Sequence, residues 1–233
     1  MRIAILETGY PPEHLIAEHG TYPDMLQRWL GPEFEYAVFD VQKGAFPADV
    51  AAHDAVAVMG SPSGVYEPDV WIAQLLDWLA AARGRTRMMG ICFGHQALAQ
   101  AWGGEVRKAP GGWGLGLHRY DVRTDEPWMD AEVTEIAIPV SHQDQVLVAP
   151  PEARVVAASA FTPHAVLAYG DHAISFQCHP EFTPAYAAAL VERRRGQVPD
   201  AALDTAAASL EAPSDNARLA EWTRSFLRGA SRT

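Results

Sequence analysis

The sequence predicts an α/β fold, with a mostly parallel sheet flanked by helices and a helical extension at the C-terminus. Over residues 1–100, short apolar runs alternate with segments of helical periodicity, which is typical of right-handed βαβ units. Residues 106–177 hold shorter β-like runs between turn signals, and helical patterns return after Phe182. We therefore expect a single domain over 1–233, with an α/β core in 1–182 and C-terminal helices in 183–233.

Four apolar runs in the first part of the chain are predicted strands, because Gly, Pro or Asp bounds each of them. These runs are residues 3–6, 34–39, 55–59 and 87–91. A helix between the last two is predicted from apolar residues that recur on one helical face. They are Trp71, Leu75, Trp78, Leu79 and Ala82. A second helix is expected over 15–30, interrupted at Gly20 and Pro23, and a third from Gly94 to a cap at 103–104.

The rest of the chain changes from strands to helices. The β-like runs, some of them expected to be antiparallel, are residues 133–138, 146–148, 165–169 and 173–176. The glycines at 111–116 predict a turn-rich loop, because no strand-to-helix step and no Lys accompany them as a phosphate cradle requires. Thr183 and Pro184 predict a helix start. Two later helical faces are predicted, one from Leu203, Ala207 and Leu210, the other from Leu219, Trp222 and Phe226.

Charge and composition exclude several classes of protein. Lys and Arg total 18 against 29 Asp and Glu, a net charge of −11, which argues against a nucleic-acid surface. We interpret Arg193, Arg194 and Arg195 as a solvated helix end. No apolar stretch is long enough for a membrane span, and the N-terminal run is too short for a secretory signal. With only two cysteines, the chain is predicted to be a soluble protein of the cytoplasm.

Metal binding is not expected from the histidine and cysteine spacing. The chain has nine histidines, but no pair at H-x3-H or C-x2-C spacing has a partner cluster. We therefore predict no metal site.

One short segment predicts a reactive cysteine. Gly90, Cys92 and Gly94 have the G-x-nucleophile-x-G spacing of a nucleophile elbow, between a predicted strand and a predicted helix. Glycines are needed there because side chains two residues either way would collide in the tight turn. A helix N-terminus also favours the thiolate, the reactive form. The five residues alone are equally compatible with a buried structural cysteine beside two turn glycines.

A second segment supplies a base and an orienting carboxylate. His179 and Glu181 are two residues apart around Pro180, after the predicted strand at 173–176. If the strand continues through them, both side chains project to one side, with Glu181 on one imidazole nitrogen and Cys92 near the other. A surface histidine beside an unrelated glutamate is the alternative, and the elbow cysteine argues against it. Cys178 lacks elbow glycines and is predicted to fill space beside the site.

With these motifs the chain resembles the class I (triad-type) glutamine amidotransferases, which have a flavodoxin-like fold, and in particular free-standing members similar to γ-glutamyl peptidases. The combination of G-x-C-x-G-x-Q with a later H-P-E carries the resemblance, which covers essentially the whole chain. The matching segments, in the family's order, are residues 8–12, 59–63, 90–96, 111–116, 141–146 and 176–182.

The resemblance implies a role for each matching residue. Cys92 is the expected nucleophile, His179 the base and then acid, and Glu181 the orienting carboxylate. Gly60 and the amide of Phe93 are expected to form an oxyanion hole. The residues expected to hold the α-amino and α-carboxylate groups of a glutamyl substrate are Gln96, Ser141, His142, Gln143 and Asp144. Met59 stands where many members carry a second glycine. No cofactor is implied.

The implied reaction is hydrolysis of a γ-glutamyl amide, of glutamine or of a γ-glutamyl peptide, through a thioester on Cys92. The alternative is a glutaminase that delivers ammonia to a separate ATP-dependent synthetase, because the chain has no Walker-type or S-G-G-x-D-S-like phosphate loop of its own. A third possibility is a non-catalytic binding protein on the same scaffold, against which the three intact residues Cys92, His179 and Glu181 argue.

Overall fold

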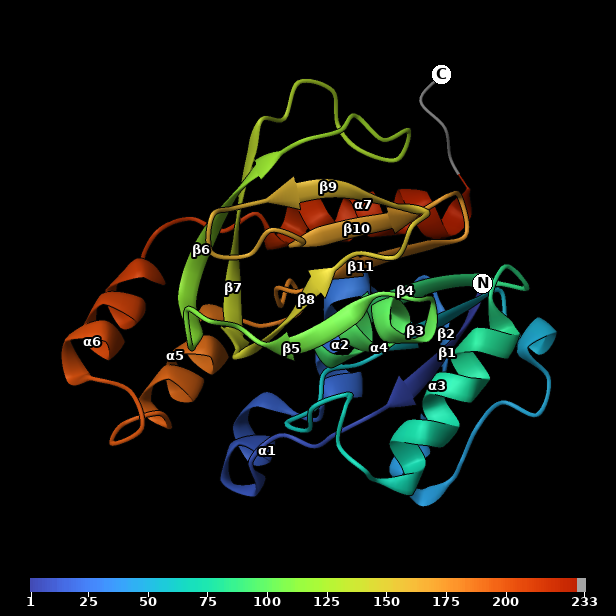
Figure 1. Cartoon of the computed structure of the whole chain (residues 1–233), viewed down its shortest axis with the longest axis horizontal. Helices are drawn as coiled ribbons and strands as arrows, with labels where there is room; N and C mark the ends of the chain where they lie inside the picture. The colour runs from blue at the N-terminus through green and yellow to red at the C-terminus, as the bar shows by residue number, and fades with distance from the viewer. Residues whose placement is uncertain (230–233) are drawn as a thin grey trace.

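The computed structural model describes residues 1–229 and consists of a central sheet with helices on both faces (Figure 1). The strands of the central sheet are β1 Arg2–Glu7, β2 Glu35–Asp40, β3 Ala55–Val58, β4 Arg87–Ile91, β6 Gly114–Val122, β7 Glu135–His142, β9 Ala153–Ala158, β10 Val166–Tyr169 and β11 Ala173–Phe176. Their order is β2-β1-β3-β4-β11-β10-β9-β6-β7. Two further strands, β5 Glu105–Lys108 and β8 Asp144–Val148, form a small antiparallel sheet.

The half of the sheet that carries β1 to β4 is parallel, as predicted. β2, β1, β3, β4 and β11 pair side by side in parallel. Both β3 and β11 are buried along their whole length because helices cover both faces, which explains their continuous apolar sequences. The carboxyl ends of β3, β4 and β11 therefore lie next to one another.

Seven α-helices surround the sheet in the described part of the chain. They are α1 Glu13–His19, α2 Tyr22–Leu30, α3 Val70–Ala82, α4 Phe93–Ala101, α5 Pro184–Glu192, α6 Asp200–Ser209 and α7 Asn216–Arg228. Short 3-10 turns lie at Val41–Lys43 and Val50–Ala52. Buried residues of α2 and α7 pack on one face of the sheet, and those of α3 and α4 on the other.

The predicted helix over 15–30 is interrupted at only one of the two expected places. Gly20, at φ +82°, separates α1 from α2. Pro23 does not interrupt α2, because it lies in the first turn, where a missing N–H costs no helical hydrogen bond. Thr21 caps this helix, and its side chain accepts a hydrogen bond from the amide of Asp24.

The antiparallel half of the sheet contains the largest departure from the sequence prediction. Residues 114–116 are not part of a loop but begin β6, which pairs with β7 and β9. Gly116, at φ +84°, is a glycine because a Cβ there would lie 2.5 Å from the backbone oxygen of Ala206 in α6. The glycine therefore allows close helix-on-strand packing instead of a turn.

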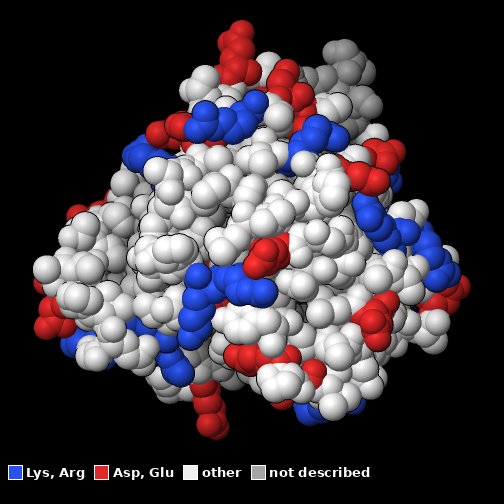
Figure 2. Space-filling model, viewed as in Figure 1, with Lys and Arg blue, Asp and Glu red and all other residues white. Residues whose placement is uncertain are grey.

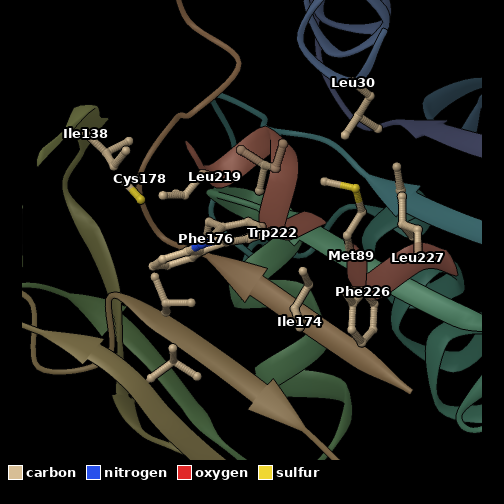
Figure 3. Packing of buried hydrophobic residues seen from close by; sticks show 14 of the residues in the cluster. Leu30, Met89, Ile138, Ile174, Phe176, Cys178, Leu219, Trp222, Phe226 and Leu227 are labelled. Atoms are coloured by element: carbon tan, nitrogen blue, oxygen red, sulfur yellow. The ribbon is translucent and has the colours of Figure 1, made fainter. Parts of the chain in front are cut away.

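The C-terminal helices pack on two parts of the sheet. α5 and α6 bury apolar residues against β6, but the buried alanine of α6 is Ala206, and the predicted Ala207 is exposed. The buried residues Leu203, Ala206 and Leu210 follow the helical spacing i, i+3 and i+7. The predicted face was therefore wrong at one position, where it placed Ala207 instead of Ala206. In α7, Trp222 and Phe226 are buried as predicted, and Trp222 packs beside Phe176 of β11 (Figure 3).

Candidate active site

Cys92 lies in the sharp turn between β4 and α4. Its φ of 50° and ψ of −102° are a strained conformation for a residue with a side chain. Two backbone hydrogen bonds hold the turn in place. The Cys92 amide donates to the carbonyl oxygen of Phe176 on β11, at 2.8 Å, and the Cys92 carbonyl accepts from the backbone amide of Gln96, at 3.0 Å. These bonds hold Cys92 at the N-terminus of α4, as the elbow motif predicts.

The two elbow glycines are required by contacts that leave no room for a side chain. A Cβ at Gly90 would lie 2.5 Å from the carbonyl oxygen of Gly94. A Cβ at Gly94 would lie 2.1 Å from the carbonyl oxygen of Val58, at the end of β3. Because backbone atoms cause both clashes, no rotamer change can relieve them. The steric reason given for these glycines from the sequence is confirmed.

The segment with His179 and Glu181 follows β11 but is not an extension of it, contrary to the expectation from their spacing. β11 ends at Phe176, and the amide of Phe182 donates to the His179 carbonyl in a turn, at 3.2 Å. The His179 amide donates to the carbonyl of Pro139 on β7, at 2.8 Å. The chain therefore bends over the carboxyl end of the sheet, and the turn brings the two side chains together.

The imidazole of His179 is fixed on two sides. Its Nδ1 lies 2.8 Å from Oε1 of Glu181, and the ring of Phe182 stacks on it with centroids 3.9 Å apart. His179 and Glu181 are both buried. Burial disfavours the imidazolium, but the charges of Glu181 and Cys92 favour it and raise the pKa of His179 to about 10. The ring is therefore held in its protonated form beside Cys92.

The loop after β3 faces both of these side chains. A Cβ on Gly60 would lie 3.3 Å from Cε1 of His179 and 3.9 Å from Cβ of Cys92. The preceding carbonyl, of Met59, accepts from the Gly94 amide at 3.0 Å and from the Thr8 hydroxyl at 2.8 Å. Met59 itself is buried in the core, so the loop accommodates it in place of a second glycine. Phe93 begins α4, where first-turn amides have no partner within the helix.

A cavity of about 530 Å³ opens onto Cys92 and His179. It brings together most of the residues predicted for the site. Those that line it are Gly60, Cys92, Gln96, Ser141, His142, Gln143, Asp144 and His179. Phe93 and Glu181 do not line it: the Phe93 side chain packs in the core beside Trp71, and Glu181 lies against His179.

Two of the predicted substrate residues are held by hydrogen bonds. The Gln96 side chain donates from Nε2 to the backbone oxygen of Asp144, at 2.9 Å. The Asp144 carboxylate accepts from the hydroxyl of Tyr66, at 2.9 Å, and burial raises its pKa. Burial also lowers the pKa of His142 to about 3, so its ring is neutral. The cavity therefore has one wall with fixed polar groups.

Gln177 was not predicted as a site residue, although its side chain lies next to the reactive group. Its Nε2 lies 3.8 Å from Sγ of Cys92 and its Oε1 accepts from Gln96, at 3.2 Å. Gln177 is completely buried, and its backbone N–H donates to the carbonyl oxygen of Ala165, at 2.8 Å. The only signal for it in the sequence is its place two residues before His179.

Cys178 has a different environment from Cys92. It is completely buried among Ile138, Leu219 and other apolar side chains (Figure 3), and it does not line the cavity. Burial raises the pKa of its thiol well above the ordinary range. A neutral, enclosed thiol agrees with the predicted filler role.

Residues 1–229 contain neither a metal-binding cluster nor a membrane-spanning helix. Among these residues, no group of three or more His, Cys, Asp or Glu side chains is arranged to hold a metal ion. Within the same range, no helix combines the length and apolar character needed to cross a bilayer.

Comparison with known proteins gives the family. The family described as Glutamine amidotransferase class-I matches residues 31–194 of the chain. Because this match spans well over half of the sequence, the protein belongs to the class I glutamine amidotransferase family. The resemblance drawn from the motifs is confirmed.

Relatives that share sequence with the chain include gamma-glutamyl peptidases and GMP synthases. Gamma-glutamyl peptidase 3 of Arabidopsis thaliana is 27% identical over 82% of this chain and 81% of its own length. Gamma-glutamyl peptidase 2 of the same plant is 27% identical over 98% and 96%. A glutamine-hydrolyzing GMP synthase of Parafrankia sp. is 36% identical over 74% of this chain, but over only 32% of the synthase.

Solved structures agree on the fold. A glutamine amidotransferase of Thermotoga maritima superimposes with a TM-score of 0.75 at 17% identity, covering 98% of this chain and 97% of that one. A glutamine amidotransferase of Methylobacillus flagellatus gives 0.70 at 21% identity, covering 100% and 96%. The predicted fold class, an α/β sheet with a parallel core flanked by helices, is confirmed.

Proposed function

We propose that the chain hydrolyses the γ-amide bond of a γ-glutamyl compound, with Cys92 as nucleophile, His179 as acid and base, and Glu181 as orienting carboxylate. The observation that carries the proposal is the His179 imidazole, held by Glu181 at 2.8 Å on Nδ1 while its Cε1 faces Gly60 beside Cys92. A nucleophile, a base and an orienting group in one cavity are the parts that covalent acyl transfer requires.

Acylation begins with attack of the Cys92 thiolate on the γ-carbonyl carbon, which forms the C–S bond. The negative charge that develops on the carbonyl oxygen is stabilised by the amides of Gly60 and Phe93. His179 then gives its proton to the leaving nitrogen, and the C–N bond breaks. The products of this half-reaction are a free amine, or ammonia from glutamine, and a γ-glutamyl thioester on Cys92.

Deacylation consumes one water molecule. Neutral His179 removes a proton from water as the oxygen attacks the thioester carbon, and the C–S bond breaks to release glutamate and the Cys92 thiolate. His179 is again an imidazolium, so the site returns to its starting state. Acid–base assistance is typically worth about 10²–10⁴-fold, and an oxyanion donor about 10²–10³-fold.

The glutamyl part of the substrate is assigned to the polar wall of the cavity. Gln96, Ser141, His142, Gln143 and Asp144 supply donors and acceptors there, and all five line the cavity. We assign them to the α-amino and α-carboxylate groups. This leaves the γ-carbonyl directed toward Cys92.

A γ-glutamyl peptide is a better candidate than glutamine for two reasons. The gamma-glutamyl peptidases match this chain over most of both lengths, whereas the GMP synthase match covers a third of the synthase. A cavity of about 530 Å³ also belongs to the size range of pockets that enclose ligands larger than one amino acid. Delivery of ammonia to a separate synthetase is the second candidate, supported by the family match and the synthase relative.

The purified chain incubated with glutamine and with a panel of γ-glutamyl peptides tests the proposal. Amine release from the peptides, faster than ammonia release from glutamine, is the expected result. Ammonia release from glutamine alone would favour the glutaminase alternative. Release from neither substrate would contradict both candidates and favour the non-catalytic protein.

A further inference from the structure

The three consecutive arginines after α5 do not share one environment, although the sequence indicated a solvated helix end for all of them. Arg195 points outward and pairs with Glu192, at 2.6 Å, and with Asp200, at 2.9 Å. Arg193 and Arg194 instead line the cavity that holds Cys92. Arg193 and Arg195 are exposed, as the predicted solvated helix end requires, whereas Arg194 is partly buried and departs from that prediction.

Arg193 and Arg194 have no acidic partner in the described part of the chain. Among the ion pairs formed by residues 1–229 at 4.0 Å or less, none includes either guanidinium group. This is notable in a chain with 29 Asp and Glu against 18 Lys and Arg, where most arginines are paired. Basic side chains gather over the region where Figure 1 draws β5 and α5 (Figure 2). Three cations, Lys108, Arg193 and Arg194, therefore line the cavity together with two carboxylates, Glu67 and Asp144. We call the part formed by Arg193 and Arg194 the cationic rim.

Arg194 is held in place before any ligand arrives. Its guanidinium lies over the ring of Trp113, 3.6 Å from the centroid, and its Nη1 donates to Oε1 of Gln197, at 3.2 Å. Trp113 also lines the cavity. A stacked guanidinium loses less conformational entropy when it binds a carboxylate, and its planar donors match the two carboxylate oxygens.

The separation between His179 and the two arginines matches the length of a short peptide leaving group. Phe182 stacks on His179 and contacts Tyr186 of α5, so the start of α5 lies against the base. The nine residues of α5 span about 13 Å, and the arginines follow its end. An extended dipeptide covers roughly 7 Å, and an arginine side chain can bridge the remaining distance. The cavity wall from His179 through Phe182 and Leu190 to the two arginines is therefore open to a leaving amine that receives its proton from His179.

We propose that Trp113, Arg193 and Arg194 form a leaving-group subsite that binds the C-terminal carboxylate of a short γ-glutamyl peptide. This inference rests on the proposed function and narrows its substrate class to γ-glutamyl peptides with a free C-terminus. Such a substrate places its glutamyl end on the polar wall and its C-terminal carboxylate on the cationic rim. Glutamine and amidated peptides lack the group that the rim recognises.

Binding to the Cys92→Ala chain tests the subsite without turnover. Isothermal titration compares γ-glutamylalanylglycine with its C-terminal amide. We expect the free carboxylate to bind roughly 10- to 100-fold tighter, as charge-assisted hydrogen bonds predict. Adding Arg193→Gln and Arg194→Gln together should bring this ratio close to one. Arg195→Gln, the matched control among the three consecutive arginines, should leave the affinity ratio unchanged.

Three results would overturn the subsite: equal affinity for the two peptides, a ratio that survives the double substitution, or no binding of either peptide. Loss of glutamine binding to the same extent in the double variant would also overturn it, because the arginines would then contact the glutamyl part. Failure of the proposed function is measured separately, as absence of turnover by the unsubstituted chain.

Discussion

Glu181 Oε1 lies 2.8 Å from Nδ1 of His179, and both side chains are almost completely enclosed. A buried carboxylate on one ring nitrogen fixes the orientation of the imidazole and stabilises its charged form. Although burial alone disfavours the imidazolium, Glu181 and Cys92 raise the pKa of His179 to about 10. The pH dependence of the reaction follows from this pair.

The first prediction concerns the fall of kcat/KM at alkaline pH. His179 keeps its proton as the pH rises past its ordinary pKa of 6.5 and loses it only as the pH passes through about 10. We expect kcat/KM for a γ-glutamyl peptide to fall in that upper range. Glu181→Gln should move the fall to lower pH and reduce activity by about 10²–10⁴-fold. Glu192→Gln, an exposed control, should change neither.

A pH series of kcat/KM for the three proteins provides the measurement. An alkaline limb at the same pH in the unsubstituted chain and in Glu181→Gln would show that Glu181 does not control the protonation of His179.

The second prediction distinguishes the two thiols. Cys92 lines the cavity beside a protonated His179, whereas Cys178 is enclosed by apolar side chains and its thiol has a raised pKa. Substoichiometric iodoacetamide near neutral pH should therefore label Cys92 far faster than Cys178. Mass spectrometry of the alkylated peptides measures the ratio. Preferential labelling of Cys178 would mean that the elbow assignment is wrong.

The third prediction concerns Gln177. Gln177→Leu removes the donor next to Sγ of Cys92 and the acceptor of Gln96. Because a hydrogen bond to a charged group is worth about 1.5–3 kcal/mol, kcat should fall roughly 10- to 100-fold. The alkylation rate of Cys92 should fall with it. Reduced thermal stability with an unchanged alkylation rate would indicate a structural role only.

The fourth prediction concerns the elbow backbone. Gly94→Ala places a Cβ 2.1 Å from the Val58 carbonyl oxygen, so it should lower the free energy of unfolding by about 3 kcal/mol, the upper end of the usual cost of overpacking. Gly84→Ala is the matched control, because nothing lies within 4 Å of its Cβ position and its φ of +71° costs only about 1–2 kcal/mol. Urea unfolding measures both. A Gly94→Ala chain as stable as the control would contradict the steric account.

Several parts of the fold and site could be predicted because their signals are local. The apolar runs at 87–91 and 173–176 coincide with β4 and β11, and Cys92 follows β4 between glycines. Apolar runs mark buried parallel strands wherever helices cover both faces. The glycines of the elbow are likewise required by a turn that spans only five residues.

Other features could not be predicted because they depend on contacts between distant segments. Gly116 has the local signature of a turn residue, but the packing of α6 on β6 is what requires a glycine there. Gln177 lies next to Cys92 only through the pairing of β11 with β4. Arg193 and Arg194 line the cavity because α5, whose Tyr186 contacts Phe182, ends beside it. Long-range packing, which no short window of sequence encodes, decides each of these positions.

The central claim is that Cys92 carries the acyl group, and turnover of Cys92→Ala tests it most directly. A γ-glutamyl peptide that the unsubstituted chain hydrolyses is the substrate, and Cys178→Ala is the control, since that thiol lies outside the cavity. The account predicts that Cys92→Ala loses nearly all amine release, by at least about 10³-fold, while Cys178→Ala retains it. Wild-type rates from Cys92→Ala would contradict the account.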